Sequence, residues 1–156
     1  MKKLLLIAML VQMAVASISY DGLIGKNENE LNNDIFLCRH HICSATEQEF
    51  IDIPLLDKTV QRIETYSDDQ GTIYEVRLYV AQVGEFENRD LAQAFFRAVE
   101  QYGKERGKVL ECSLEYVFDK YGNKSIVKIV DPGRRDAYRE RMKKSYIEAL
   151  RLGAKK

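Results

Sequence analysis

Apolar and polar residues alternate along two stretches of the chain, which is the pattern of β-strands with one buried face. The clearer stretch is the segment 107–130. Five of its residues fall on every second position: Leu110, Cys112, Leu114, Tyr116 and Phe118. A run at 119–124 that contains Gly and Asn separates them from a second apolar strand at 125–130. This segment predicts a β-hairpin.

A second hairpin is predicted for the segment 59–83, because a strong turn signal at 67–71 ends in Gly71. The second strand of this hairpin carries apolar residues at alternate positions: Tyr74, Val76, Leu78 and Val80. We expect this set to face the core, and the residues between them to be half exposed.

One helix is predicted after each hairpin. The first is predicted from Arg89 to about Arg106, with Gly107 as its C-cap and an apolar stripe at i, i+3, i+4 spacing. The second is predicted to begin at Asp131 and Pro132, as N-cap and first helical residue, and to end near Gly153. One face of the second helix holds Tyr138, Met142, Ser145, Tyr146 and Ala149.

The order of elements is therefore hairpin, helix, hairpin, helix. Each hairpin has one apolar face and each helix one apolar stripe, so a single antiparallel sheet with both helices packed on one face would bury them all. We predict an α+β fold for residues 35–153, with a short tail at 154–156.

The N-terminus has the organisation of a signal peptide. Two lysines precede an apolar run at 4–15, and Ala14-Val15-Ala16 is a cleavage site of the A-x-A type. We expect residues 1–16 to be removed and the product to be periplasmic or secreted; the alternative is an uncleaved anchor. Residues 17–34 are mostly polar and predict a flexible leader.

The formal net charge of +0 hides an asymmetry along the chain. Residues 17–100 contain 7 basic and 16 acidic side chains, a net charge of −9, whereas residues 101–156 contain 15 and 8, a net charge of +7. Such a polar molecule can steer a charged partner, and the alternative is that the two halves attract each other within the fold.

Three cysteines are an odd number for an exported protein. Cys38 and Cys43 are expected to form a disulfide, which requires the residues between them to turn. Cys112 shares the strand face of Leu110 and Leu114, so we expect a buried, unreactive thiol. A bridge from Cys112 to either other cysteine stays open.

The segment 38–43 also supports an alternative function. It brings together thiols and both imidazoles of the chain, which are ligands for zinc or copper: Cys38, His40, His41 and Cys43. A metal-binding or thiol-redox module is therefore the second hypothesis. Disulfide formation competes with it, because oxidised cysteines offer no thiolate.

No motif of a known catalytic site occurs in the sequence. There is no Gly-rich phosphate loop, no H-E-x-x-H and no G-x-S-x-G. We predict no catalytic residue and no cofactor, although an enzyme assembled from residues distant in sequence stays a third hypothesis.

The leading hypothesis is a non-enzymatic binding or adaptor protein in a cell-envelope or extracellular assembly. Apolar residues on the second face of the predicted sheet are its candidate binding surface: Ile73, Tyr79, Val83, Val109 and Val117. The expected partner is another protein or a second copy of this chain. The basic C-terminal helix is also suited to an anionic surface, and no nucleic-acid partner is expected.

Overall fold

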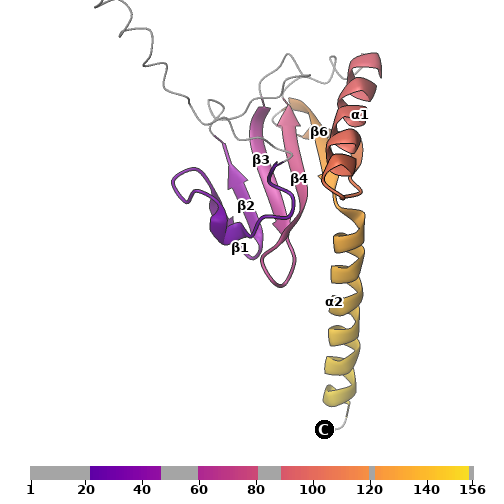
Figure 1. Ribbon diagram of the computed structural model, residues 1–156. Helices are drawn as coiled ribbons and strands as arrows, with labels where there is room; N and C mark the ends of the chain where they lie inside the picture. The colour runs from indigo at the N-terminus through magenta and orange to yellow at the C-terminus, as the bar shows by residue number, and fades with distance from the viewer. Residues whose placement is uncertain (1–21, 47–59, 81–88, 120–121, 155–156) are drawn as a thin grey trace, which may run out of the picture.

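The computed structural model describes residues 22–46, 60–80, 89–119 and 122–154. Six antiparallel strands in these residues form one sheet, in the order β1-β2-β3-β4-β6-β5 (Figure 1). The strands are β1 (Leu37–Arg39), β2 (Ile42–Ala45), β3 (Val60–Ser67), β4 (Ile73–Val80), β5 (Glu111–Asp119) and β6 (Gly122–Val130). The helices are the short 3₁₀ helix η2 (Glu28–Glu30), α1 (Arg89–Glu105) and α2 (Pro132–Gly153). The α+β class predicted from the sequence is confirmed.

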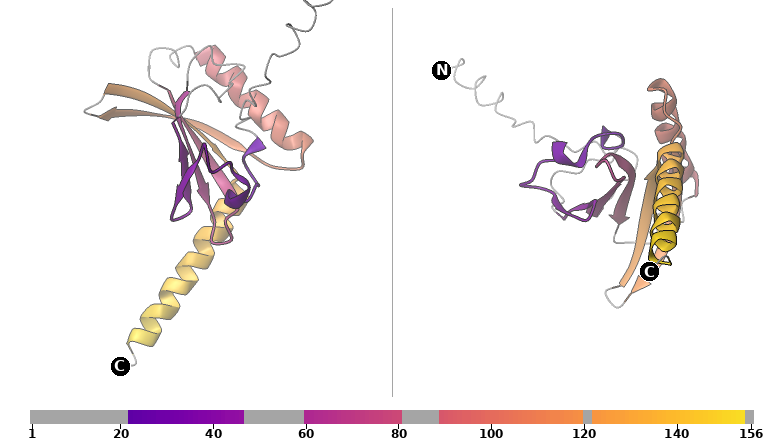
Figure 2. Two further views of the ribbon diagram at one scale, coloured as in Figure 1. Left: turned by 90° about the vertical axis from the view of Figure 1, so that its left-hand side faces the viewer. Right: turned by 90° about the horizontal axis from the view of Figure 1, so that it is seen from below.

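The two predicted hairpins are β3–β4 and β5–β6, and they join through β4 and β6. The register places Ile63 of β3, Leu78 of β4 and Val127 of β6 side by side across the sheet, and all three side chains are fully buried. This face is the core, as the alternation in β4 predicted. α1 packs on it through Val99, which is 1% exposed, and lies across the sheet in Figure 2.

The N-terminal segment covers the rest of the core face. Four of its side chains are at most 6% exposed: Leu23, Ile24, Leu31 and Phe36. The backbone of this segment pairs with β4, because the N–H of Gly25 donates to the carbonyl of Ile73 at 2.9 Å. The predicted flexible leader is therefore wrong for residues 22–34, and residues 17–21 lie outside the described part. The polar run around its few apolar residues concealed that these join the hydrophobic core cluster, together with Cys43 of β2 and Ile63 of β3.

A tight hairpin precedes β3, where the sequence indicated only short strand pieces. β1 and β2 are joined by His40 and His41, whose φ angles are 50° and 64°. Two consecutive residues with positive φ are typical of a type I′ turn, whose twist matches that of the flanking strands. Histidine is not the residue usually found there, which is why the sequence did not signal a two-residue turn.

The position of α2 differs from the expectation that both helices lie on one face. No residue of α2 is buried, and the helix continues beyond the end of the sheet (Figures 1 and 2). Within the described residues, its contacts with the sheet come from its first turns, which meet β4, the β3–β4 turn and Glu111 of β5. No helix in the described ranges is both long and apolar enough to cross a membrane.

Candidate functional site

α2 starts at a fixed position on the sheet. Asp131 is its N-cap, and the Asp131 side chain accepts a hydrogen bond from the backbone N–H of Arg134 at 3.0 Å. The backbone N–H of Asp131 itself donates to the carbonyl of Tyr74 in β4 at 2.8 Å. Pro132 has no N–H to leave unpaired in the first turn. The sequence predicted this helix start correctly, and the bond to Tyr74 fixes it to the sheet.

A buried carboxylate ties the next turn of α2 to the β3–β4 turn. Asp68 is 1% exposed, and its Oδ1 accepts the backbone N–H groups of Gln70 and Thr72 at 3.0 and 2.9 Å. Its other oxygen, Oδ2, lies 3.2 Å from Nη1 of Arg134. One side chain therefore shapes the turn and holds the helix, with a separate oxygen for each task.

Two further contacts lie along the following turns of α2. The rings of Tyr138 and Tyr74 are 5.8 Å apart between centroids. Nη2 of Arg141 lies 2.6 Å from Oδ1 of Asp69, and this hydrogen bond to Arg141 holds the pKa of the Asp69 carboxyl below its usual range. Both partners are exposed, so this pair contributes less to stability than the buried Asp68.

The helix then continues without support from the rest of the described chain. Every residue from Met142 to Gly153 is exposed. Three apolar side chains with i, i+4, i+8 spacing lie on one face of this part, and we call them the distal stripe: Met142, Tyr146 and Leu150. They are 50%, 66% and 56% exposed. Ile147 and Leu152 add further exposed apolar surface at 40% and 63%.

The charges on α2 are mainly basic. It contains three acidic side chains, Asp136, Glu140 and Glu148, and seven basic ones: Arg134, Arg135, Arg139, Arg141, Lys143, Lys144 and Arg151. Arg139 and Lys143 are adjacent to the distal stripe by helical spacing. The exposed half of α2 is thus an apolar strip with basic neighbours.

The binding residues predicted from the sequence do not form one surface. Ile73 is fully buried under the N-terminal segment, so this part of the prediction is wrong. Tyr79 is half-buried in β4, Val117 is half-buried in β5, and Val109 lies before β5 with 74% of its surface exposed. Val83 is outside the described residues.

Tyr79 belongs instead to a polar network on the second face of the sheet. The hydroxyls of Tyr79 and Tyr66 donate to the same oxygen of Glu64, at 2.6 and 3.0 Å. The guanidinium of Arg62 lies over the Tyr79 ring and that of Arg77 over the Tyr66 ring, each 4.1 Å from the centroid. Burial, followed by the hydrogen bond to Glu64, raises the pKa of Tyr79. These side chains are charged or carry hydroxyl groups and contact one another, so this face offers a partner little apolar surface.

The segment 38–43, which contains two cysteines and both histidines, forms a disulfide-linked hairpin. Cys38 and Cys43 are opposite each other in β1 and β2 and form the predicted disulfide, with their Cα atoms 4.0 Å apart. In the described residues no group of three or more potential ligands could hold a metal ion. Nδ1 of His41 lies 2.9 Å from Oε1 of Glu28, which connects the turn to η2. The structure offers the metal hypothesis no support.

Cys112 lies on the core face of β5, next to Ile129 of β6, as its phase predicted. Burial, with a smaller contribution from the charge of Glu100, raises the pKa of the Cys112 thiol to about 12. A thiol with such a pKa is almost entirely protonated near neutral pH and is a poor nucleophile.

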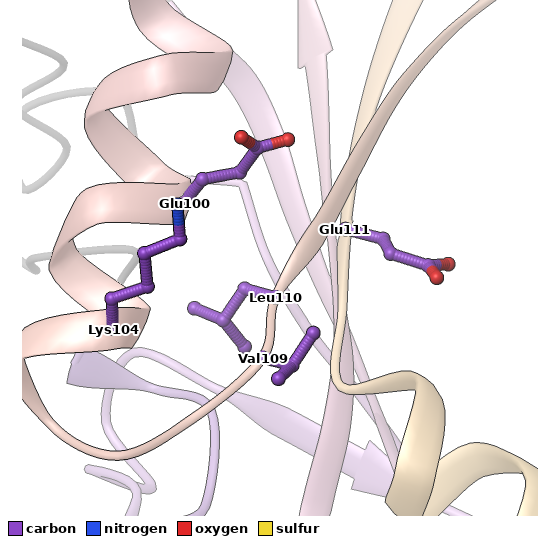
Figure 3. A pocket seen from close by; sticks show the side chains of 5 residues that line it. All are labelled: Glu100, Lys104, Val109, Leu110 and Glu111. Carbon is purple, nitrogen blue, oxygen red and sulfur yellow. The ribbon is translucent and has the colours of Figure 1, made fainter.

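A small pocket lies between α1 and the start of β5, and sequence reasoning missed it. Its volume is about 270 Å³, and it is lined by Glu100, Lys104, Val109, Leu110 and Glu111. Figure 3 shows Glu100 and Lys104 on the helix and Leu110 on the segment opposite, whereas the Glu111 carboxylate points away from the helix.

Gly103 allows α1 to approach this segment closely. A Cβ at position 103 would lie 2.7 Å from the carbonyl oxygen of Lys108 and 3.0 Å from Leu110. The backbone N–H of Lys108 also donates to the carbonyl of Gly103 at 2.8 Å. A glycine inside a helical pattern was the one sequence signal of this contact.

No protein-family model, curated protein or solved structure matches this chain.

Proposed function

We propose that this protein is a small exported, non-enzymatic adaptor that binds another protein through the distal stripe of α2. The observation that carries the proposal is the contrast between the two halves of this helix. Its first half is held by Asp131, Asp68 and Tyr74, while its second half exposes Met142, Tyr146 and Leu150. Helices in proteins gain most of their stability from packing an apolar face, and here the distal half packs on nothing in the described chain.

The charges on α2 favour a partner with an apolar groove and an acidic rim. An amphipathic helix binds such a groove through apolar side chains at i, i+4 spacing, and Arg139 and Lys143 would lie at its edges. A second copy of α2 is disfavoured, because each helix carries four more basic than acidic side chains and the two would repel each other.

Export is supported by the A-x-A signal sequence at 1–16 and by the disulfide between Cys38 and Cys43, a bond that persists mainly in oxidising compartments. The mass of the protein purified from cells tests this part. We expect a chain that begins at Ser17 and carries one disulfide. A chain that retains Met1 would contradict cleavage.

The binding proposal is tested by photo-crosslinking in the cells that express the protein. A photoreactive phenylalanine replaces Tyr146, and Leu37 in the control, since Leu37 is also exposed but lies on β1. We expect one discrete protein adduct from position 146 and none of that mass from position 37. Adducts of lipid alone, or of a second copy alone, would contradict the proposal.

The partner identified in this way is then purified and its affinity measured. Leu150→Glu should weaken binding by at least about tenfold, because a carboxylate enters the apolar contact and faces the acidic rim. The matched control is Leu37→Glu, the same change at 63% rather than 56% exposure, which should leave the affinity unchanged. Equal affinities for both variants would exclude the distal stripe as the contact surface.

A further inference from the structure

The two edge strands of the sheet differ in length and in protection. β1 has three residues and is stapled to β2 by the disulfide. β5 has nine residues, and none of the described residues other than those of β6 forms backbone hydrogen bonds with it. Proteins usually shorten or cover an edge strand, because its free N–H and C=O groups pair readily with another chain. A long open edge beside a pocket therefore needs an explanation.

The pocket between α1 and β5 has the size of a side-chain site. Its volume of about 270 Å³ is below the range of about 300–1,000 Å³ typical of small-molecule sites. Its apolar surface comes from Val109 and Leu110, which lead directly into β5. One side chain of a strand lying along β5 would enter this space while the backbone of that strand pairs with β5.

We propose that β5 accepts an extended segment of a partner protein, with alternating apolar and basic residues, as an additional strand of the sheet. The main-chain bonds would provide affinity, and the pocket between α1 and β5 would select one apolar side chain. This surface is separate from the distal stripe of α2, so the inference goes beyond the proposed function: an adaptor would hold two partners.

The faces of β5 determine the expected residue pattern of the segment. Cys112, Leu114 and Tyr116 lie on the core face, and Tyr116 is 42% exposed there. Alternate side chains of an added strand would extend this apolar face. The other side chains would lie beside Glu111 and Glu115 on the opposite face of β5.

The acidic side chains decide between a basic segment and a second copy of β5. The side chain of Glu111 is 60% exposed and that of Glu115 is 50% exposed. Each has a basic neighbour within the protein: Glu115 pairs with Lys128, and Glu111 lies 3.9 Å from Arg135. Antiparallel pairing of two β5 strands would bring four carboxylates to one face of the joint. Like charges across strands are destabilising, whereas lysine or arginine in the added strand is favourable.

The first experiment measures binding of synthetic peptides by fluorescence anisotropy. The probe is a seven-residue peptide in which lysine and valine alternate, and its control has the same composition with all lysines before all valines. We expect the alternating peptide to bind at least about tenfold more tightly. Equal affinity, or no binding of either peptide, would overturn the proposal, because attraction between charges alone needs no alternation.

N-methylation of the peptide backbone tests strand addition directly. Successive N–H groups of a strand point to opposite sides, so methylation of one alternate set removes the bonds to β5 and methylation of the other set leaves them intact. We expect one methylated isomer to lose binding and the other to retain it. Equal loss for both isomers would contradict pairing with β5.

Variants locate the site and separate it from α2. Val109→Glu should weaken binding of the alternating peptide at least about tenfold. Because Val109 is exposed and precedes β5, this change should not unfold the protein. Leu37→Glu, at the opposite edge, and Leu150→Glu, in the distal stripe, should bind the peptide as the unchanged protein does. Loss of binding in Leu150→Glu would place the peptide on α2 instead, and a dimer that Val109→Glu dissociates would assign the edge to a second copy; either result overturns the proposal.

Discussion

Nη1 of Arg134 lies 3.2 Å from Oδ2 of Asp68, although 66 residues separate them in the chain. The carboxylate is buried and the arginine is partly exposed, with 38% of its side chain accessible. Because Oδ1 of Asp68 holds the β3–β4 turn while Oδ2 faces Arg134, the direction of α2 depends on the conformation of a turn in a different hairpin.

Replacing Asp68 separates these two tasks. Asp68→Ala removes both oxygens and should lower the free energy of unfolding by about 2 kcal/mol, since the backbone N–H groups of Gln70 and Thr72 lose their acceptor. Asp68→Asn keeps one amide oxygen for the turn but places an NH₂ group toward Arg134. We expect a smaller loss of stability in Asp68→Asn and faster hydrogen exchange in the first turns of α2. Urea denaturation and mass spectrometry measure the two effects.

The neighbouring carboxylate is the control for this comparison. Asp69→Ala removes an exposed partner of Arg141 and should change stability little, because exposed ion pairs are screened by water. Equal destabilisation by Asp68→Ala and Asp69→Ala would show that burial of Asp68 is not the cause.

Gly103→Ala should push α1 away from the start of β5. Its new methyl group would meet the Lys108 carbonyl, and overpacking of this kind costs about 1–3 kcal/mol. Gly153→Ala is the matched control, because nothing lies within 4 Å of a Cβ at that position. Thermal denaturation of both variants tests the contact. A Gly103→Ala protein as stable as the control would contradict a tight helix–strand approach.

Cys112 should resist thiol reagents in the native protein. Its raised pKa leaves little thiolate near neutral pH, so we expect labelling to become rapid only after addition of denaturant. Cys112→Ala should cost about 1 kcal/mol through a small cavity. Cys112→Ser should cost more, because a hydroxyl there lacks a predictable partner. Rapid native labelling would show that the assigned core face of β5 is wrong.

Stability should fall in alkali. The pKa of Cys112 rises from its ordinary value of 9.0 to about 12 on folding, so its contribution is complete below about pH 9 and is lost as the pH rises toward about 12. The pKa of Tyr74 is also raised, chiefly by burial, and changes stability in the same direction. Urea midpoints across this range should drop less in Cys112→Ala than in the unchanged protein. Identical slopes would exclude a role of the thiol.

The turn between β1 and β2 should become more stable when asparagine replaces His40. Asparagine tolerates positive φ better than most residues, so His40→Asn should raise the free energy of unfolding by about 0.5 kcal/mol. His40→Val is the opposite control, since a β-branched residue is strongly disfavoured at positive φ. Denaturation curves of the oxidised protein distinguish them. A more stable His40→Val protein would contradict the left-handed conformation of this turn.

Patterns of neighbouring residues were sufficient to predict most strands of the sheet and the start of α2. Alternation predicted β3 to β6 and placed Cys112 on the core face, and Asp131 with Pro132 marked the start of α2. The burial of Leu23 and Leu31 was missed, because it depends on a region of sheet that becomes available only after folding. Periodicity gives the face of an element but not the element that covers it.

The candidate binding surfaces were less predictable than the fold. Met142 and Tyr146 of the distal stripe were assigned to one face of α2, whereas Leu150 was not. The exposure of the stripe follows from a helix that projects beyond the sheet, and no local pattern encodes that direction. The pocket beside β5 depends on how closely Gly103 lets two segments approach. Ile73 was assigned to a binding face because alternation along β4 does not reveal the register shift between Tyr66 and Ser67, at the end of the strand where Ile73 joins the core cluster.

The part of α2 beyond Arg141 acts as a lever. Twelve helical residues from Met142 to Gly153 span about 18 Å at about 1.5 Å per residue. A tilt of about 5° at the anchoring turns would therefore displace the free end by about 1.5 Å, a shift comparable to the rise of one helical residue. A protein bound at that end would be sensitive to the geometry of the β3–β4 turn without touching it.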